Sequence, residues 1–192
     1  MYSIRRNIFL LVVSVEFILL LLAPPPSIAG EATVSDYLIT NTPEQVLVYF
    51  RVKNCFSKAM EDAILAGITT TFLFTIELYS QRSFWFDKKE SVLEIKHSVK
   101  YDNVKRTLYV TYTESGKKPE QFKELRKAEI AMSDLSGIPI IAVTRLIRDK
   151  QYYVRVRAEL VKIRLPLDLK NTFLFSSLWN FKTDWFRQDF IY

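Results

Sequence analysis

The stretch ITTTFLFTIELYS, residues 68–80, decides the fold class of this chain. Its alternate positions are apolar or β-branched, and in an extended chain they would share one face: Ile68, Thr70, Phe72, Phe74, Ile76 and Leu78. A period of two is typical of a strand that buries one of its faces. We therefore predict a long, half-buried strand over residues 68–80.

The same period recurs on both sides of this stretch. It predicts a strand over residues 45–53 and two further strands over 93–101 and 104–112. Asp102 and Asn103 separate the last two strands, and this pair is typical of a tight hairpin turn. These two strands are therefore expected to be adjacent and antiparallel.

A second hairpin is predicted later in the chain. The apolar run 138–147 and a strand over 151–165 flank the polar segment 148–150, which would form the turn. The alternation within the second strand reverses after Leu160, as one extra residue would cause at a β-bulge. The aromatic segment 178–192 is expected to form a last strand. That strand would lie either in the core or at a sheet edge that a partner could pair with.

Two helices are predicted between the strands. Ser57 can cap a short helix that Gly67 closes, with Met60, Ala63 and Ile64 on its apolar face. A second helix would start at Pro119 and run to Ser136 and Gly137, because apolar residues recur at helical spacing: Phe122, Leu125, Ala128, Met132 and Leu135. Together these elements predict a mainly β fold, an antiparallel β-sandwich of about eight strands decorated by two helices.

The N-terminal segment has the order of regions found in a secretory signal. Two arginines precede an apolar run over residues 8–23, and three prolines and the small residues of 27–29 follow it. The apolar run is shorter than the roughly 20 residues that usually span a bilayer. We therefore predict that residues 1–29 are a signal peptide, cleaved after Ala29, or an uncleaved anchor. Residues 31–192 would form a single β-rich domain in the periplasm or at the outer face of the inner membrane.

The composition excludes several kinds of site. The chain has 192 residues, with four glycines, one cysteine and one histidine. So few glycines leave no room for a glycine-rich phosphate loop, and one cysteine allows no internal disulfide. One cysteine and one histidine are also too few for the usual metal sites, so no cofactor is expected. The net charge of +6 favours anionic surfaces. Nucleic acid is not expected as a partner, because export would separate the chain from it.

Two features that resemble catalytic groups have plainer explanations. His97 lies on the apolar side of its predicted strand, where a histidine is more often a core residue than a general base. Ser115 and Lys118 have the S-x-x-K spacing of penicillin-recognising enzymes, but the companion motifs of those enzymes are missing. A surface turn is the preferred interpretation of this second feature.

The best candidate for a binding surface is a positive row on one sheet face. Its members are basic or aromatic: Arg145, Tyr153, Arg155 and Arg157, continued by Lys162 and Arg164 after the reversal. Arginine forks suit carboxylate and phosphate groups, and the tyrosine could contact a peptide or a glycan. The alternative is a solvated outer face on which Glu159 and acids of neighbouring strands pair with the arginines.

Three stretches, taken together, resemble one bacterial family. They are Leu65-Ala66-Gly67-Ile68-Thr69 running into the strand to Tyr79, with Arg82 and Trp85; His97-Ser98-Val99-Lys100-Tyr101-Asp102 with Leu108, Tyr109 and Val110; and residues 152–160 leading to Leu165-Pro166-Leu167, with Trp179 and Trp185. In these features the chain resembles the family called domain of unknown function 4390, over essentially the whole mature chain. The resemblance implies a small exported protein of Gram-negative bacteria, with no catalytic residues assigned. It also implies a gene next to that of a membrane sensor kinase of the nitrogen-regulation type.

The sequence therefore predicts a non-enzymatic binding or accessory module of the cell envelope. The expected partner is another envelope or membrane protein, and a membrane sensor kinase is one candidate. An anionic lipid or a glycan is an alternative ligand. An exported hydrolase with an unrecognised site is the alternative function.

Overall fold

The computed structural model describes residues 31–161 and 182–192 of the chain. It has these elements: β1 (Thr33–Asn41), β2 (Gln45–Lys53), α2 (Lys58–Leu65), β3 (Thr70–Ser80), β4 (Lys88–Asp102), β5 (Thr107–Tyr112), β6 (Glu120–Phe122), α3 (Leu125–Ser133), β7 (Asp134–Ala142), the 3-10 turn η1 (Val143–Arg145), β8 (Gln151–Leu160) and β9 (Phe186–Ile191). The strands form a three-stranded sheet, β1-β2-β7, and a six-stranded sheet, β6-β5-β4-β3-β8-β9. Every pairing is antiparallel, so the predicted mainly β fold with two helices is confirmed.

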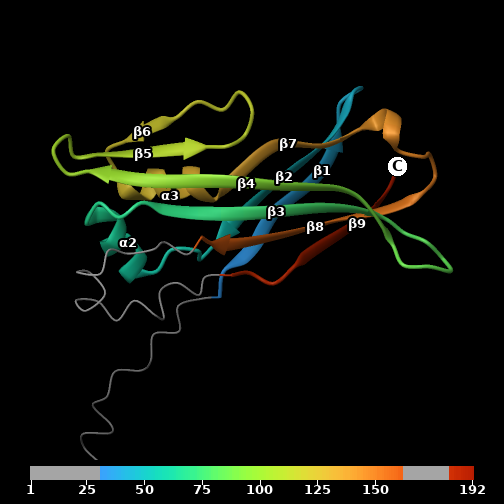
Figure 1. Cartoon of the computed structure of the whole chain (residues 1–192), viewed down its shortest axis with the longest axis horizontal. Helices are drawn as coiled ribbons and strands as arrows, with labels where there is room; N and C mark the ends of the chain where they lie inside the picture. Colours follow the sequence, from blue (N-terminus) through green and yellow to red (C-terminus); the bar gives the residue numbers. More distant parts are fainter. Residues whose placement is uncertain (1–30, 162–181) are drawn as a thin grey trace, which may run out of the picture.

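The two sheets share one hydrophobic core, and β3 lies at its centre (Figure 1). The inward residues of β3 are almost completely buried: Phe72, Phe74, Ile76 and Leu78. Phe74 meets Phe50 of β2 edge to face, with ring centroids 6.1 Å apart, which joins one sheet to the other. Burying a large apolar side chain contributes about 1.5–3 kcal/mol, so this row is a main source of stability.

The first predicted hairpin is confirmed. β4 and β5 pair from His97 with Tyr112 to Asp102 with Thr107. In the turn, the carboxylate of Asp102 accepts hydrogen bonds from the backbone N–H groups of Val104 and Lys105, each at 2.9 Å. Val104, which the pattern assigned to the second strand, lies in this turn instead and is 94% exposed.

The second predicted hairpin is wrong. β7 pairs with β2 in the smaller sheet, whereas β8 pairs with β3 and β9 in the larger one. The turn η1 and the segment 146–150 carry the chain from one sheet to the other. A polar turn between two apolar runs indicates that the chain reverses direction, but it does not indicate which strand each run will pair with.

The first predicted helix is confirmed as α2. Ser57 is its N-cap, and its hydroxyl accepts a hydrogen bond from the N–H of Met60 at 3.3 Å. The helix packs Met60, Ala63 and Ile64 inward. Gly67 has a φ of +87°, a left-handed conformation that glycine adopts without strain after a helix end.

The second predicted helix is too long at both ends. The segment 120–122 is extended and forms β6, which pairs with β5. Helix α3 begins at Leu125, and the backbone extends again from Asp134, so that Leu135 belongs to β7. Apolar spacing cannot separate these states where short strands flank a short helix, because β6 and β7 are defined by their hydrogen bonds to other strands, β5 and β2.

The first and last strands, β1 and β9, differ in how well the sequence predicted them. β1 was not predicted, because a bulge between Ser35 and Leu38, with Asp36 at a φ of +53°, breaks its alternation. β9 is an edge strand beside β8, and its Phe186 and Phe190 pack against the core.

The predicted reversal beyond Leu160 and the N-terminal signal or anchor lie outside the described residues. Within those residues, no helix is long and apolar enough to cross a membrane.

Candidate functional site

The residues of the predicted positive row do not all lie together. Tyr153, Arg155 and Arg157 alternate on the outer face of β8, as expected. Arg145 lies apart, in η1 at one end of the sandwich, where its guanidinium donates to the carbonyl of Glu90 at 3.4 Å. Lys162 and Arg164 lie outside the described residues.

Arg155 is committed to contacts within the sheet. Its Nε donates to the carboxylate of Glu77 and its Nη2 to the hydroxyl of Tyr79 at 3.0 Å. Its guanidinium lies over the ring of Trp185, 4.3 Å from the centroid. Lys89 pairs with the other oxygen of Glu77 at 2.7 Å.

Glu77 stays ionised at the centre of this group. Burial acts to raise the pKa of Glu77, but hydrogen bonds from Lys89, Arg155 and Tyr79 outweigh it and hold the pKa below its usual range. The carboxylate therefore keeps both cations in place at neutral pH.

The neighbouring residues form a stacked layer on the same face. Arg157 lies over Trp185 at 4.5 Å, and its Nη2 is 3.8 Å from Glu159. Tyr153 stacks on Tyr79 with ring centroids 5.0 Å apart, and Arg187 covers Tyr153 at 3.7 Å. We call the set of Glu77, Tyr79, Lys89, Tyr153, Arg155, Arg157, Trp185 and Arg187 the outer-face cluster. Its four cations pair with Glu77 inside the cluster and with Glu159 and Asp189 beside it. An anionic ligand would therefore have to compete with acids already in place.

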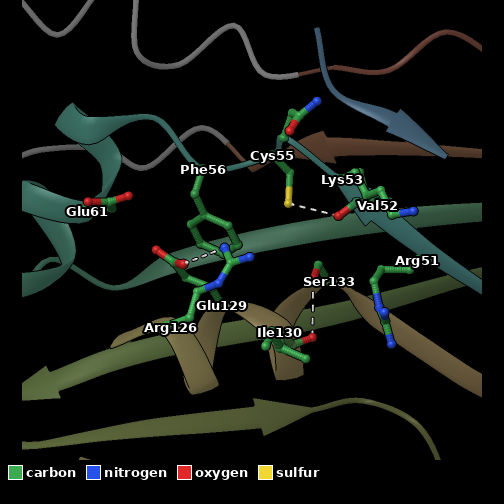
Figure 2. Close-up of a pocket in the computed structure, with 11 residues that line it drawn as sticks. Arg51, Val52, Lys53, Cys55, Phe56, Glu61, Arg126, Glu129, Ile130 and Ser133 are labelled. Carbon is green, nitrogen blue, oxygen red and sulfur yellow. Dashed lines mark hydrogen bonds and ion pairs between the residues drawn. The ribbon is translucent and has the colours of Figure 1, made fainter. Parts of the chain in front are cut away.

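A pocket of about 410 Å³ lies between the end of β2, the segment that leads into α2, and α3 (Figure 2). It is lined by Arg51, Val52, Lys53, Asn54, Cys55, Phe56, Glu61, Arg126, Glu129, Ile130 and Ser133. Figure 2 shows the ring of Phe56 in its centre, beside Arg126 and Glu129. The sequence pattern did not indicate this pocket, because its walls come from segments that are far apart along the chain.

The hydroxyl and thiol groups of the pocket are not set up as nucleophiles. Cys55 is buried and its thiol donates to the carbonyl of Val52 at 3.3 Å. Burial raises the pKa of this thiol to about 12, so it stays protonated. The hydroxyl of Ser133 donates to the carbonyl of Ile130 at 3.2 Å rather than to a base.

The charges of the pocket are mixed in sign. Burial, followed by the charge of Glu61, raises the pKa of Glu129, and Arg126 at 3.5 Å only partly offsets this. Arg51 reaches Asp134 at 3.1 Å, and Lys53 reaches Asp36 at 3.5 Å, so both cations are held at the rim. The pocket therefore offers acidic and basic groups around an apolar centre.

His97 is completely buried near the same end of the sandwich, and both of its ring nitrogens are engaged. Its Nδ1 lies 2.9 Å from the carbonyl oxygen of Met132, and its Nε2 lies 2.7 Å from Glu114. A carbonyl can only accept, so Nδ1 carries a proton and Nε2 shares one with Glu114. Although burial acts to raise it, the pKa of Glu114 is held below its usual range by His97 and then by Lys117. This pair ties α3 to β4 and to the loop after β5.

The S-x-x-K feature forms no site with His97. Ser115 and Lys118 are both exposed in the loop between β5 and β6, as a surface turn would require. Lys117 instead lies over the ring of Tyr112 at 3.9 Å and 3.6 Å from Glu114. Among the residues that the structure describes, no three Asp, Glu, His or Cys side chains are grouped to hold a metal ion.

The model of a protein family described as a domain of unknown function, DUF4390, matches residues 29–189. The chain belongs to the DUF4390 family. The match covers both helices, every strand except the last two residues of β9, the outer-face cluster and the pocket of Figure 2. Comparisons of this DUF4390 protein with curated proteins and with solved structures found no match.

Proposed function

We propose that this protein is a non-enzymatic accessory protein of the cell envelope that binds another envelope protein through the pocket of Figure 2. The order of charged, apolar and small residues in the first 29 positions supports an exported protein. The periplasm or the outer face of the inner membrane is its proposed location.

The observation that carries this proposal is a pocket with groups for recognition and none prepared for reaction. Its thiol is protonated and its serine donates to a backbone carbonyl. A hydrolase of the serine or cysteine type needs a nucleophile held by a base, and the described lining residues provide no such pair. Binding is the function that remains for these groups.

The chemistry of the pocket fits a short segment of another protein. Its volume of about 410 Å³ suits one or two side chains. Phe56 and Ile130 offer apolar contact, and Arg126 and Glu129 offer charges of both signs beside it. A segment with one apolar residue next to charged ones would satisfy all of these groups. A membrane sensor kinase is the first candidate for the protein that carries it.

Photo-crosslinking in intact cells tests this proposal. A photoreactive amino acid in place of Ile130, in the pocket, should form a crosslink to a membrane protein. The same amino acid in place of Val104, in the exposed β4–β5 turn, is the matched control and should not. Arg126→Glu should abolish the crosslink while leaving the folded protein intact, because the Arg126 side chain is mostly exposed.

Two results would overturn the proposal. One is crosslinking at position 130 that captures no protein although the chain is folded and exported. The other is hydrolysis of ester or peptide substrates by the purified protein that Ser133→Ala or Cys55→Ala abolishes.

A further inference from the structure

The loop between β3 and β4 exposes three consecutive aromatic residues. Phe84 is 98% exposed, Trp85 is 74% exposed and Phe86 is 84% exposed. The rings of Trp85 and Phe86 contact each other edge to face, with centroids 6.1 Å apart. Large apolar side chains scattered singly on a surface are ordinary, but three in a row at the end of a hairpin are not.

The base of this loop is tied to the sheet. The backbone N–H of Arg82 donates to the carboxylate of Asp87 at 3.1 Å, which closes the loop. The backbone N–H of Gln81 donates to the carbonyl of Gln151 at 2.9 Å, which joins the loop to the start of β8. The aromatic side chains are therefore held out beyond the sheet instead of covering it.

Two further exposed apolar residues lie on the segments beside the loop. Ile147 is 62% exposed and Ile191 is 67% exposed. The backbone N–H of Ile147 donates to the hydroxyl of Tyr152, and Tyr152 pairs with Ser80 at the end of β3. We call Phe84, Trp85, Phe86, Ile147 and Ile191 the apolar tip. Figure 1 shows this loop, in green, at the end of the molecule opposite α2 and α3.

Cations without acidic partners surround the apolar tip. They lie on the loop itself and on the segment between β7 and β8: Arg82, Arg145, Arg148 and Lys150. Within the described part of the chain, none of the four forms an ion pair. Acids nearby are already engaged, since Glu90 pairs with Lys88 at 2.8 Å and Asp189 with Arg187 at 2.7 Å. The charges available to a partner at this end are therefore mainly positive, with Asp87 and Asp149 as the exceptions.

We infer that the apolar tip inserts into the surface of an anionic lipid bilayer. Three successive residues of one loop that are each at least 74% exposed point into solvent on several sides. A flat protein interface covers one side of such a loop, whereas a fluid apolar phase surrounds it and buries all three rings. Aromatic side chains favour the boundary between lipid headgroups and acyl chains, and flanking cations reach anionic headgroups.

This inference does not depend on the proposed function. The apolar tip and the pocket lie at opposite ends of β3, an 11-residue strand. At a rise of about 3.3 Å per residue, such a strand separates its ends by roughly 35 Å. One end can therefore contact lipid while the other contacts a protein.

The test places the full-length chain on vesicles and asks where Trp85 lies. Lipids with brominated acyl chains quench tryptophans that enter the bilayer, and Trp85→Phe removes the contribution of this one residue. The difference between the wild-type and Trp85→Phe signals therefore reports Trp85 alone, whatever holds the rest of the chain on the vesicle. With phosphatidylglycerol in a phosphatidylcholine vesicle, we expect this difference signal to be quenched and shifted to shorter wavelength.

Charge reversal with a matched control tests the role of the cations. Arg82→Glu with Arg148→Glu should raise the phosphatidylglycerol vesicle concentration needed for half-quenching by on the order of 25-fold, at about fivefold per cation. Lys105→Glu with Lys118→Glu makes the same change in net charge in the two turns that flank β5. This control pair should leave the half-quenching concentration within about twofold, since a Debye length is only about 8–10 Å.

Three outcomes would overturn the inference. The Trp85 signal could remain unquenched, or the two charge-reversal pairs could weaken quenching equally. The chain could also form a dimer in solution that the triple variant Phe84→Ser, Trp85→Ser and Phe86→Ser converts to a monomer. This last result would assign the tip to a second copy of the chain.

Discussion

The two ends of the sandwich depart from the usual distribution of side chains in opposite directions. At the end that carries α2 and α3, which we call the helix end, a polar group is buried and hydrogen-bonded: His97, whose two ring nitrogens contact Met132 and Glu114. At the end that carries the β3–β4 loop, large apolar groups such as Phe84 are almost fully exposed. Buried polar groups stabilise a fold only while they remain paired, whereas exposed apolar groups contribute little to stability. The paired polar groups of the helix end are therefore expected to contribute more to stability than the exposed apolar groups of the tip.

The largest effect is expected from removing the histidine of the buried pair. His97→Ala leaves the Glu114 carboxylate without its main partner and opens a cavity beside Phe74, whose ring centroid is 5.1 Å from that of His97. Loss of this hydrogen bond to a carboxylate, together with the cavity, should cost about 3–5 kcal/mol in the free energy of unfolding. Chemical denaturation measures this loss. A loss below about 1 kcal/mol would mean that the helix end does not depend on the pair.

The pH dependence of stability tests the contribution of Glu114, the partner of His97. The folded-state pKa of Glu114 is lowered, so its contribution is present above the unfolded value of about 4.3 and is lost as the pH falls through the folded value. Glu114→Gln should therefore be less stable than the wild type at neutral pH. The difference should shrink steadily below about pH 4.3 as the wild-type carboxyl becomes protonated. A difference that stays constant over this range would contradict the prediction.

A smaller effect is expected from the outer-face cluster. Arg155→Ala removes one of two cations from Glu77 and uncovers the ring of Trp185, and it should cost about 1–2 kcal/mol. Lys89 and Tyr79 still hydrogen-bond Glu77, which limits the loss. Arg145→Ala is the matched control and should change the free energy of unfolding by less than about 0.5 kcal/mol. Equal losses in the two variants would contradict the special role given to the contacts of Arg155.

The smallest effect on stability is expected at the apolar tip. The triple variant Phe84→Ser, Trp85→Ser and Phe86→Ser removes side chains that are mostly in solvent. It should change the free energy of unfolding by less than about 1 kcal/mol in total, because surface substitutions are nearly neutral. Thermal denaturation of the purified protein checks this. A large loss would place the aromatic residues among the groups that maintain the fold.

Local pattern was sufficient for much of the fold. The strand over 68–80, the hairpin that follows it and the cap at Ser57 depend on residues that are close along the chain. The pairing of β7 with β2 could not be predicted, because it is decided by packing between segments about 90 residues apart. The helical spacing over 119–137 was equally compatible with two short strands around a short helix. Only the pairing of residues 120–122 with β5 distinguishes the two.

In the candidate sites too, contacts between segments that are distant in sequence could not be predicted. The alternation of Arg155 and Arg157 indicated their shared face but not their acidic partners, since Glu77 comes from a strand that is distant in sequence. The pocket of Figure 2 had no local signal at all. The apolar tip did have one: Phe84, Trp85 and Phe86 stand between two predicted strands, where polar turn residues are usual.

The buried thiol of Cys55 can report how often this part of the protein opens. It is the only cysteine in the chain, so an alkylating reagent has one place to react. Because the group is buried and protonated, the reaction must wait until the segment between β2 and α2 opens locally. The labelling rate, compared with that of a free thiol, therefore measures how often the pocket wall opens in an otherwise native molecule. A segment seated in the pocket would slow that rate without any change to the chain itself.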